Sequence, residues 1–220
     1  MAPVCVFDVN ETLLDLAALD GEFERVFGDR GVRVVWFGQL LQSAMVSTIT
    51  GRYTDFGSVG RAALEMTAAR LGVELSADDR EAVVGGMTRL PAHPEVPAAL
   101  RRLGEGGLRL AALTNSTERV ARAQLEHAGL IDAFEAVLSA DAVRRLKPAP
   151  EPYRMAADRL GVDPGEVLLV AAHAWDVAGA LRAGCQAVFV ARPGKVLDPL
   201  ADRPGLVVAD LDELADRLLA

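Results

Sequence analysis

The chain is poor in cysteine, in aromatic residues and in positive charge. Its 220 residues include 2 cysteines and 5% aromatic residues, and 23 Lys and Arg stand against 31 Asp and Glu, for a net charge of -8. Without an excess of cations there is no basic field to attract a phosphate backbone, so nucleic acid is not an expected partner. The chain is 51% hydrophobic, and at this length it can bury a core without disulfides or a structural metal.

Long hydrophobic runs are also missing. No apolar stretch reaches the roughly 18 residues of a membrane span, and Asp8 interrupts the apolar start of the chain before a signal-peptide core could form. Cys5 and Cys185 each lie inside a short apolar run, which is typical of buried, unreactive thiols in a reducing compartment. We therefore expect a cytoplasmic protein with no membrane partner.

Short apolar runs in this sequence have the composition of buried parallel strands. They comprise the run that ends before Asp8 and the segments 109–116, 135–140, 166–173, 186–191 and 206–210. From about residue 94 onward they alternate with helical patterns. This alternation predicts an α/β fold, Rossmann-like, with a mostly parallel sheet and helices on both faces.

Residues 15–91 show helical periodicity and no strand-like run of comparable strength. Gly28 and Gly72 mark expected helix ends. We therefore expect an inserted helical cap domain at 15–91 and an α/β core domain made of 1–14 and 92–220. The apolar residues that we expect at the cap surface, where they would suit a homodimer, are Leu40, Leu41, Met45 and Ile49.

Polar side chains gather where the expected strands end. The set comprises Asp8, Asn10 and Thr12 after the first strand, Thr114, Asn115 and Ser116 after the second, Lys147 and Tyr153 after the third, and His173 and Asp176 after the fourth. Because parallel strands end at one edge of a sheet, these residues should converge on one crevice. Alone, each has an ordinary structural explanation: Ser116 could cap the next helix, and Lys147 could be a solvated loop cation. Together, and in this order, they indicate a catalytic site.

Four motifs in this order resemble those of the haloacid dehalogenase superfamily. DVNETLLD is similar to its nucleophile loop, ALTNS to its second motif, LKP to its lysine motif and AAHAWDVAGA to its acidic fourth motif. GRYTDF at 51–56, the Lys147-to-Tyr153 spacing and AWD at 174–176 resemble the type II branch, the L-2-haloacid dehalogenases. The resemblance covers essentially the whole chain, and it implies a hydrolase with a helical cap after the first strand.

The resemblance also implies which reaction is run. Superfamily members that hydrolyse phosphate esters have an aspartate at the position of Asn10, to protonate the leaving group, and an acidic Mg²⁺ ligand at the position of Ala172. Asn10 cannot act as a general acid. A halide leaves as a stable anion and needs neither a proton donor nor a metal to assist it. We therefore expect cleavage of a carbon–halogen bond, with no metal and no cofactor.

The resemblance assigns a role to each polar residue. Asp8 attacks the halogen-bearing carbon of a small-molecule substrate, an (S)-2-haloalkanoic acid, and water then hydrolyses the resulting ester. Lys147 would keep Asp8 ionised, and Asp176 would activate or orient the water. Thr12, Ser116 and Asn115 would donate hydrogen bonds to the substrate carboxylate or to Asp8. The expected substrate-binding residues are Asn10, Thr114, Asn115, Phe37, Tyr153, His173 and Trp175.

Departures from the family pattern keep alternatives open. Phe37 stands where the family has a halide-binding arginine, and in the fourth motif Ala171 matches its serine and His173 its asparagine. His173 could replace the asparagine as a hydrogen-bond donor or act as a second base beside Asp176. The alternatives are a Mg²⁺-dependent phosphatase of the same superfamily and a catalytically silent binding scaffold.

Overall fold

The computed structural model describes residues 4–220, so residues 1–3 of the expected core segment lie outside the described residues. Its sheet contains β1 (Val4–Phe7), β2 (Leu110–Thr114), β3 (Ala136–Ser139), β4 (Val167–Ala171), β5 (Gln186–Val190) and β6 (Leu206–Val208). The order is β3-β2-β1-β4-β5-β6, and every neighbouring pair is parallel. The expected Rossmann-like α/β fold is confirmed, with a strand in each apolar run.

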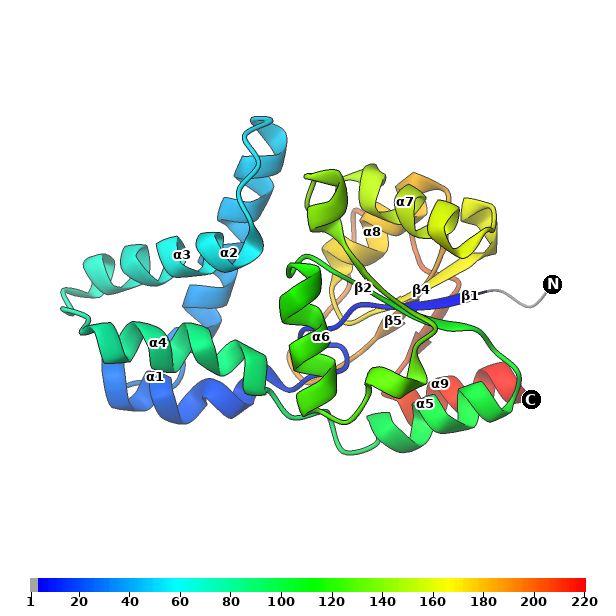
Figure 1. Ribbon diagram of the computed structural model, residues 1–220, viewed down its shortest axis with the longest axis horizontal. Helices are drawn as coiled ribbons and strands as arrows, with labels where there is room; N and C mark the ends of the chain where they lie inside the picture. Colours follow the sequence, from blue (N-terminus) through cyan, green and yellow to red (C-terminus); the bar gives the residue numbers. More distant parts are fainter. Residues whose placement is uncertain (1–3) are drawn as a thin grey trace.

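Helices cover both faces of the sheet, which is why its strands are apolar on both sides. In β1, Cys5 and Phe7 belong to one buried apolar cluster and Val4 and Val6 to the other. One face packs against α7 (Pro150–Leu160) and α8 (Ala174–Ala183), and the other against α5 (Val96–Glu105), α6 (Glu118–His127) and α9 (Leu211–Leu219). Figure 1 shows α7 and α8 on the opposite side of the sheet from α5 and α9.

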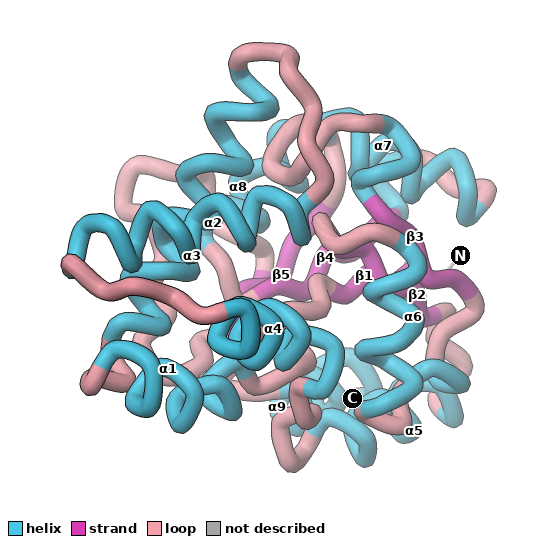
Figure 2. Tube along the Cα trace, turned by 60° about the vertical axis from the view of Figure 1, so that its left-hand side comes forward, coloured by secondary structure: helices cyan, strands magenta, loops and turns pink. Residues whose placement is uncertain are grey.

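The remaining α-helices form the cap that follows the loop after β1. They are α1 (Asp20–Phe27), α2 (Val32–Ile49), α3 (Phe56–Leu71) and α4 (Ala77–Gly86). Figures 1 and 2 show them grouped beside the sheet rather than against either of its faces. α1 and α3 end at Gly28 and Gly72, both with positive φ, as expected. The division of the chain at residues 15 and 91 stays a prediction.

Short 3-10 turns link several of these elements: η1 (Leu16–Leu19), η2 (Met87–Arg89), η3 (Ile131–Ala133), η4 (Ala140–Val143) and η5 (Pro164–Glu166). Within residues 4–220, no helix is long and apolar enough to cross a membrane. Cys5 and Cys185 are free and buried, as expected. Burial raises the pKa of Cys5 to about 12 and that of Cys185 to about 11, so both thiols stay protonated at neutral pH.

The apolar interior of the cap is continuous with the apolar cluster on one face of the sheet, and it corrects one expectation. Trp36 is buried and donates a hydrogen bond from Nε1 to the carbonyl oxygen of Gly60 at 3.0 Å, which joins α2 to α3. Leu40, which we expected at the surface, is buried beside this contact because α3 packs against that side of α2. Ile49 is exposed, and Leu41 and Met45 are half-buried.

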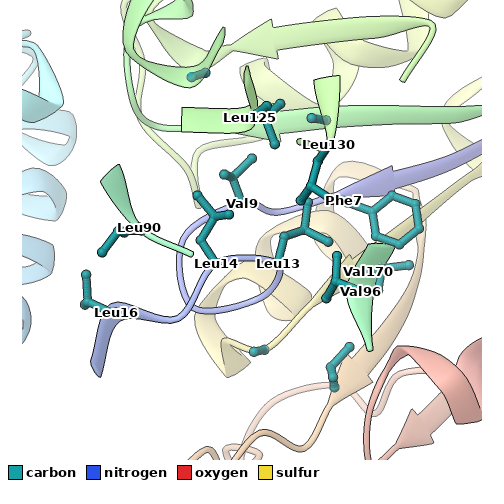
Figure 3. Packing of buried hydrophobic residues seen from close by; sticks show 14 of the residues in the cluster. Phe7, Val9, Leu13, Leu14, Leu16, Leu90, Val96, Leu125, Leu130 and Val170 are labelled. Atoms are coloured by element: carbon teal, nitrogen blue, oxygen red, sulfur yellow. The ribbon is translucent and has the colours of Figure 1, made fainter. Parts of the chain in front are cut away.

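The loop after β1 is anchored by its apolar residues. Val9, Leu13 and Leu14 are fully buried, and Figure 3 shows them packed among side chains that include Leu90 and Val96. The amide of Leu13 donates to the carbonyl oxygen of Val9 at 2.9 Å, which closes the loop tightly. Polar side chains between these anchors are therefore held in place relative to the sheet.

Candidate active site

The predicted site lies where the strand order of the sheet reverses. From β1 the chain proceeds to β2 and β3 on one side and later to β4, β5 and β6 on the other, so a crevice opens between the carboxyl ends of β1 and β4. Asp8 follows β1 and His173 follows β4. A small cavity of about 10 Å³, called here the chamber, is lined by Asp8, Asn10, Phe37, Leu41, Phe56, Thr114, Asn115, Lys147, His173 and Trp175.

A buried lysine joins two carboxylates at the centre of this site. Lys147 Nζ lies 2.9 Å from Asp8 Oδ1, 2.6 Å from Asp176 Oδ2 and 3.0 Å from the carbonyl oxygen of Leu113. Each hydrogen of the ammonium group thus has an acceptor. The Lys147 side chain is completely buried, so water does not screen these charges.

The charges of the site set the protonation states of these groups. Burial alone would raise the pKa of Asp8, but the charge of Lys147 and the hydrogen bond and charge of His173 hold it well below its usual range. Burial likewise lowers the pKa of Lys147, and the two carboxylates more than reverse this. The pKa of Asp176 is raised, chiefly by burial and also by the charge of Asp8. Asp8 is therefore an ionised carboxylate at neutral pH, as a nucleophile must be.

Thr12 and Tyr153 orient the two carboxylates from outside the chamber. Thr12 Oγ1 donates to Asp8 Oδ2 at 2.7 Å and accepts from the amide of Ala172 at 2.9 Å. Tyr153 donates from its hydroxyl to Asp176 Oδ1 at 2.5 Å. A Cβ at Gly179 would lie only 2.6 Å from that hydroxyl, so glycine lets α8 approach α7 this closely.

The amides of Asn115 and Asn10 meet protein groups rather than an open space. Asn115 accepts at Oδ1 from the amide of Lys147 at 2.7 Å and donates from Nδ2 to the carbonyl oxygen of Lys147 at 3.2 Å. Asn10 accepts at Oδ1 from Gln124 at 3.0 Å and donates to Ser116 Oγ at 3.4 Å. Both were expected to bind substrate, and both line the chamber, but their contacts hold Lys147 and the nucleophile loop in position.

Thr114 lines the chamber, whereas Ser116 lies beside it. Among residues 4–220, Ser116 has no hydrogen bond with Asp8; its amide donates to Thr114 Oγ1 at 3.2 Å. The N-cap position of α6 is occupied by Thr117, not by Ser116, and the Thr117 side chain makes no capping hydrogen bond. Ser116 instead lines a cavity of about 610 Å³, called here the vestibule, which α2, α3, α4 and the start of α6 surround. Phe56 lines both the vestibule and the chamber.

His173 bridges two carboxylates at the edge of the chamber. Its Nδ1 lies 3.3 Å from Asp8 Oδ2 and its Nε2 lies 2.9 Å from Glu11 Oε2. The ring stacks on Trp175, with centroids 5.1 Å apart, and lies 6.1 Å from Phe37. Burial alone would lower the pKa of His173, but the hydrogen bonds and charges of Asp8 and Glu11 raise it to about 8.

The raised pKa makes the stability of the protein depend on pH. A histidine whose pKa is about 8 when folded and near 6.5 when unfolded stabilises the fold fully below pH 6.5, and this stabilisation is lost as the pH rises through 8. We expect the free energy of unfolding to fall by about 2 kcal/mol more between pH 6 and pH 9 in the wild type than in His173→Asn. Urea unfolding of both proteins across this range measures the difference, and parallel curves would contradict the assignment.

The sequence analysis missed a group of charged residues behind the nucleophile loop. Glu11 lies between Asn10 and Thr12, which the sequence analysis had identified. Lys195 Nζ lies 2.5 Å from Glu11 Oε2. Arg192 donates from Nη2 to the carbonyl oxygen of Thr12 at 2.9 Å. Arg192 and Lys195 follow β5, so the rule that selected polar residues after the other strands would have found them. Gln124 had no such signal, because it lies on a helix.

The described residues contain no group of three or more His, Cys, Asp and Glu side chains placed to hold a metal ion. Phe37 is buried and lines the chamber. Trp175 also faces the Lys147 ammonium, which lies 5.9 Å from the centre of its ring. The chamber thus combines an ionised carboxylate with an apolar wall, an arrangement suited to displacement reactions on a small, partly apolar substrate.

Comparison with known proteins gives a consistent result. A family model described as haloacid dehalogenase-like hydrolase matches residues 2–184. An (S)-2-haloacid dehalogenase of Pseudomonas sp. (strain YL) is 33% identical over 207 residues, which cover 93% of this chain and 89% of that protein. Another from Xanthobacter autotrophicus is 35% identical over 194 residues, with 87% and 76% covered. A solved structure of L-2-haloacid dehalogenase from Xanthobacter autotrophicus, with chloropropionic acid covalently bound, has a TM-score of 0.91, 31% identity and 98% coverage of both chains.

Proposed function

Because the chain belongs to the family of haloacid dehalogenase-like hydrolases, we propose that it hydrolyses the carbon–halogen bond of small (S)-2-haloacids with Asp8 as the nucleophile. The observation that carries this proposal is the buried Asp8 carboxylate. Lys147 lies 2.9 Å from it and keeps it ionised, and one wall of the adjoining chamber is apolar. In such a position a carboxylate can attack carbon without the water that would otherwise solvate it.

The reaction has two steps. An oxygen of Asp8 forms a bond to the halogen-bearing carbon, the carbon–halogen bond breaks, and its electron pair leaves with the halide. Water then attacks Cγ of the Asp8 ester, and the bond between Cγ and the alkylated oxygen breaks to release a 2-hydroxyacid. Asp176 is the base that we assign to this water, since Asp8 is esterified at this step and the raised pKa of Asp176 favours uptake of a proton.

The Mg²⁺-dependent phosphatase alternative is not favoured. The position that would hold its general acid is Asn10, whose amide is already bonded to Gln124 and Ser116. Ala172 stands at the position of the expected acidic ligand, and its side chain has nothing to coordinate with. The named relatives are dehalogenases. A silent scaffold is disfavoured because the Asp8, Lys147 and Asp176 cluster keeps both of its charged contacts.

The two cavities suggest how the substrate enters and where the halide binds. The chamber has about 10 Å³ of free space while the vestibule has about 610 Å³, so we propose that substrate enters through the vestibule and passes Phe56. The family's halide-binding arginine is replaced by Phe37. We therefore assign the halide to the apolar wall that Phe37, Leu41 and Trp175 form.

Halide release from a panel of (S)- and (R)-2-haloacids tests the proposal. We expect the purified protein to release halide from (S)-2-halopropionates and not from the (R)-enantiomers, at rates that do not change when a chelator is added. Ion chromatography measures the halide. Phosphate release from phosphate esters that rises with Mg²⁺, with no halide release from any acid, would overturn the proposal in favour of the phosphatase.

We further propose a cytoplasmic homodimer. Two free, buried cysteines suit a reducing compartment. Apolar side chains are exposed on α2, where they would suit an isologous contact; these are Val34, Val35, Val46 and Ile49.

A further inference from the structure

We propose that His173, held in its charged form by Glu11, acts with Thr12 as the oxyanion-stabilising pair for hydrolysis of the Asp8 ester, and that Oδ2 of Asp8 is the oxygen they stabilise. Oδ1 is then the oxygen that attacks the substrate. This inference rests on the proposed dehalogenase reaction. It adds a role for His173, a positioning role for Glu11 and an assignment of the two carboxylate oxygens.

The contacts of the two Asp8 oxygens differ. Oδ2 lies 2.7 Å from Thr12 Oγ1 and 3.3 Å from His173 Nδ1, whereas Oδ1 lies 2.9 Å from Lys147 Nζ. Lys147 has another carboxylate partner, Asp176, at 2.6 Å. An oxygen that attacks carbon gives up negative charge, while the remaining oxygen becomes a carbonyl and then carries a full charge in the tetrahedral intermediate. Preorganised donors stabilise that intermediate most when they face the second oxygen.

Glu11 is placed to keep the imidazole charged and fixed. Its Oε2 lies 2.9 Å from His173 Nε2, so a hydrogen on each ring nitrogen has an acceptor only when His173 is an imidazolium. Lys195 Nζ lies 2.5 Å from the same Glu11 oxygen, and Arg33 Nη1 lies 3.9 Å from the other. These cations keep Glu11 ionised after Asp8 has lost its charge to the ester.

Atoms and charge are conserved through both steps of the reaction. Asp8 Oδ1 bonds to the substrate carbon and the halide leaves with the electron pair. A water oxygen then bonds to Cγ, the Cγ–Oδ2 π electrons move onto Oδ2, and the first water proton passes to Asp176. The tetrahedral intermediate expels Oδ1 with the product, which takes that proton back. The new Asp8 carboxyl releases the second proton to solvent, so each turnover yields one halide, one alcohol and one proton.

The charge of His173 depends on every ionisable group around it. These groups are Asp8 and Glu11, which it contacts, Asp176 and Lys147 behind Asp8, and Lys195 and Arg33 behind Glu11. Ester formation removes one negative neighbour and leaves Glu11 as the contact that favours the cation. The rate of ester hydrolysis should therefore fall as the pH rises and His173 loses its proton, and replacement of Glu11 should move this fall to lower pH.

Rapid-quench kinetics with (S)-2-chloropropionate test the proposal in the wild type, Glu11→Gln and His173→Ala. We expect the first turnover of halide release to slow less than the later hydrolysis of the ester in both variants, because the contact of Oδ1 with Lys147 is unchanged. Steady-state turnover should fall about 10²-fold in His173→Ala, the usual loss for one oxyanion donor, and the Asp8 ester should accumulate as a mass adduct. Glu135→Gln, an exposed pair with Arg109, is the matched control and should behave as wild type.

The pH profiles provide a second readout that a merely structural role would not move. We expect an alkaline fall in the wild type, a fall at lower pH in Glu11→Gln, and none in His173→Ala. If both variants slow halide release and ester hydrolysis equally, with no adduct, the proposal is wrong. It is also wrong if the wild-type rate of ester hydrolysis rises with pH and this rise is absent in His173→Ala, since His173 would then act as a base. If the wild type itself forms neither halide nor adduct, the dehalogenase proposal fails first and this one with it.

Discussion

Asp8→Asn is expected to abolish halide release, by at least about 10⁴-fold. An amide has nearly the same shape as the carboxylate but no negative charge with which to attack carbon. Asp8 is buried, and in the variant the single amide oxygen can still accept from Lys147 while the NH2 group faces Thr12 Oγ1, a hydroxyl oxygen that can accept. The variant should therefore fold, and its loss should be one of chemistry. Asp158→Asn, an exposed change of the same kind on α7, is the matched control.

Isotope labelling makes the same prediction sharper. In a single turnover of the wild type in ¹⁸O-water, we expect label in Asp8 and unlabelled oxygen in the first equivalent of product, because water attacks Cγ and the original oxygen leaves. Mass spectrometry of the peptide that contains Asp8 measures the label. Label that appears directly in the first product would mean that water attacks the substrate carbon, and Asp8 would then be a base rather than a nucleophile.

Lys147→Met is expected to abolish activity and to lower the free energy of unfolding by about 3–5 kcal/mol, the usual cost when one partner of a buried ion pair is removed. The Lys147 side chain is fully buried between Asp8 and Asp176. Without it the two carboxylates face each other, one takes up a proton at neutral pH, and the nucleophile is weakened. Urea unfolding and halide release measure the two effects separately.

The double variant Lys147→Met with Asp176→Asn provides the control for this prediction. Because it removes one of the two uncompensated carboxylates, we expect it to recover a large part of the lost stability while halide release stays absent. If Lys147→Met alone kept a tenth or more of wild-type activity, Lys147 would not be the group that keeps Asp8 ionised.

Much of this site could be predicted because strand ends are local features. Asp8, Thr114, Lys147 and His173 each follow an apolar run, and parallel strands must end at one edge. Arg192 and Lys195 obey the same rule after β5 and could have been included. The sequence did not single out Glu11 as a site residue among the polar residues of its loop. Only the turn of the folded chain directs its side chain to His173 rather than to solvent.

Hydrogen-bond partners were the weakest part of the sequence prediction. Asn115 was expected to face substrate, yet both ends of its amide bind the backbone of Lys147. Ser116 was expected to donate to Asp8 or to the substrate carboxylate; it has no contact with Asp8 among the described residues and lines the vestibule, so a contact with substrate stays a prediction. An amide or hydroxyl side chain can bond to any donor or acceptor within about 3 Å. Because one residue along a strand already spans about 3.3 Å, a residue's place at a strand end does not fix which partner it meets.

The sequence by itself determined the α/β class and the order of the strand-end residues, and it predicted the place of the helical insertion. These properties depend on the spacing of apolar and polar residues along the chain. Only the tertiary structure decided that Thr12 and His173 meet Oδ2 of Asp8 while Lys147 meets Oδ1, and that Glu11 supports His173 from behind. The physical reason is that Lys147 and His173 lie more than a hundred residues from Asp8 in the chain and must approach it to within about 3 Å. The packing of the two apolar layers sets this precision, and periodicity does not encode it.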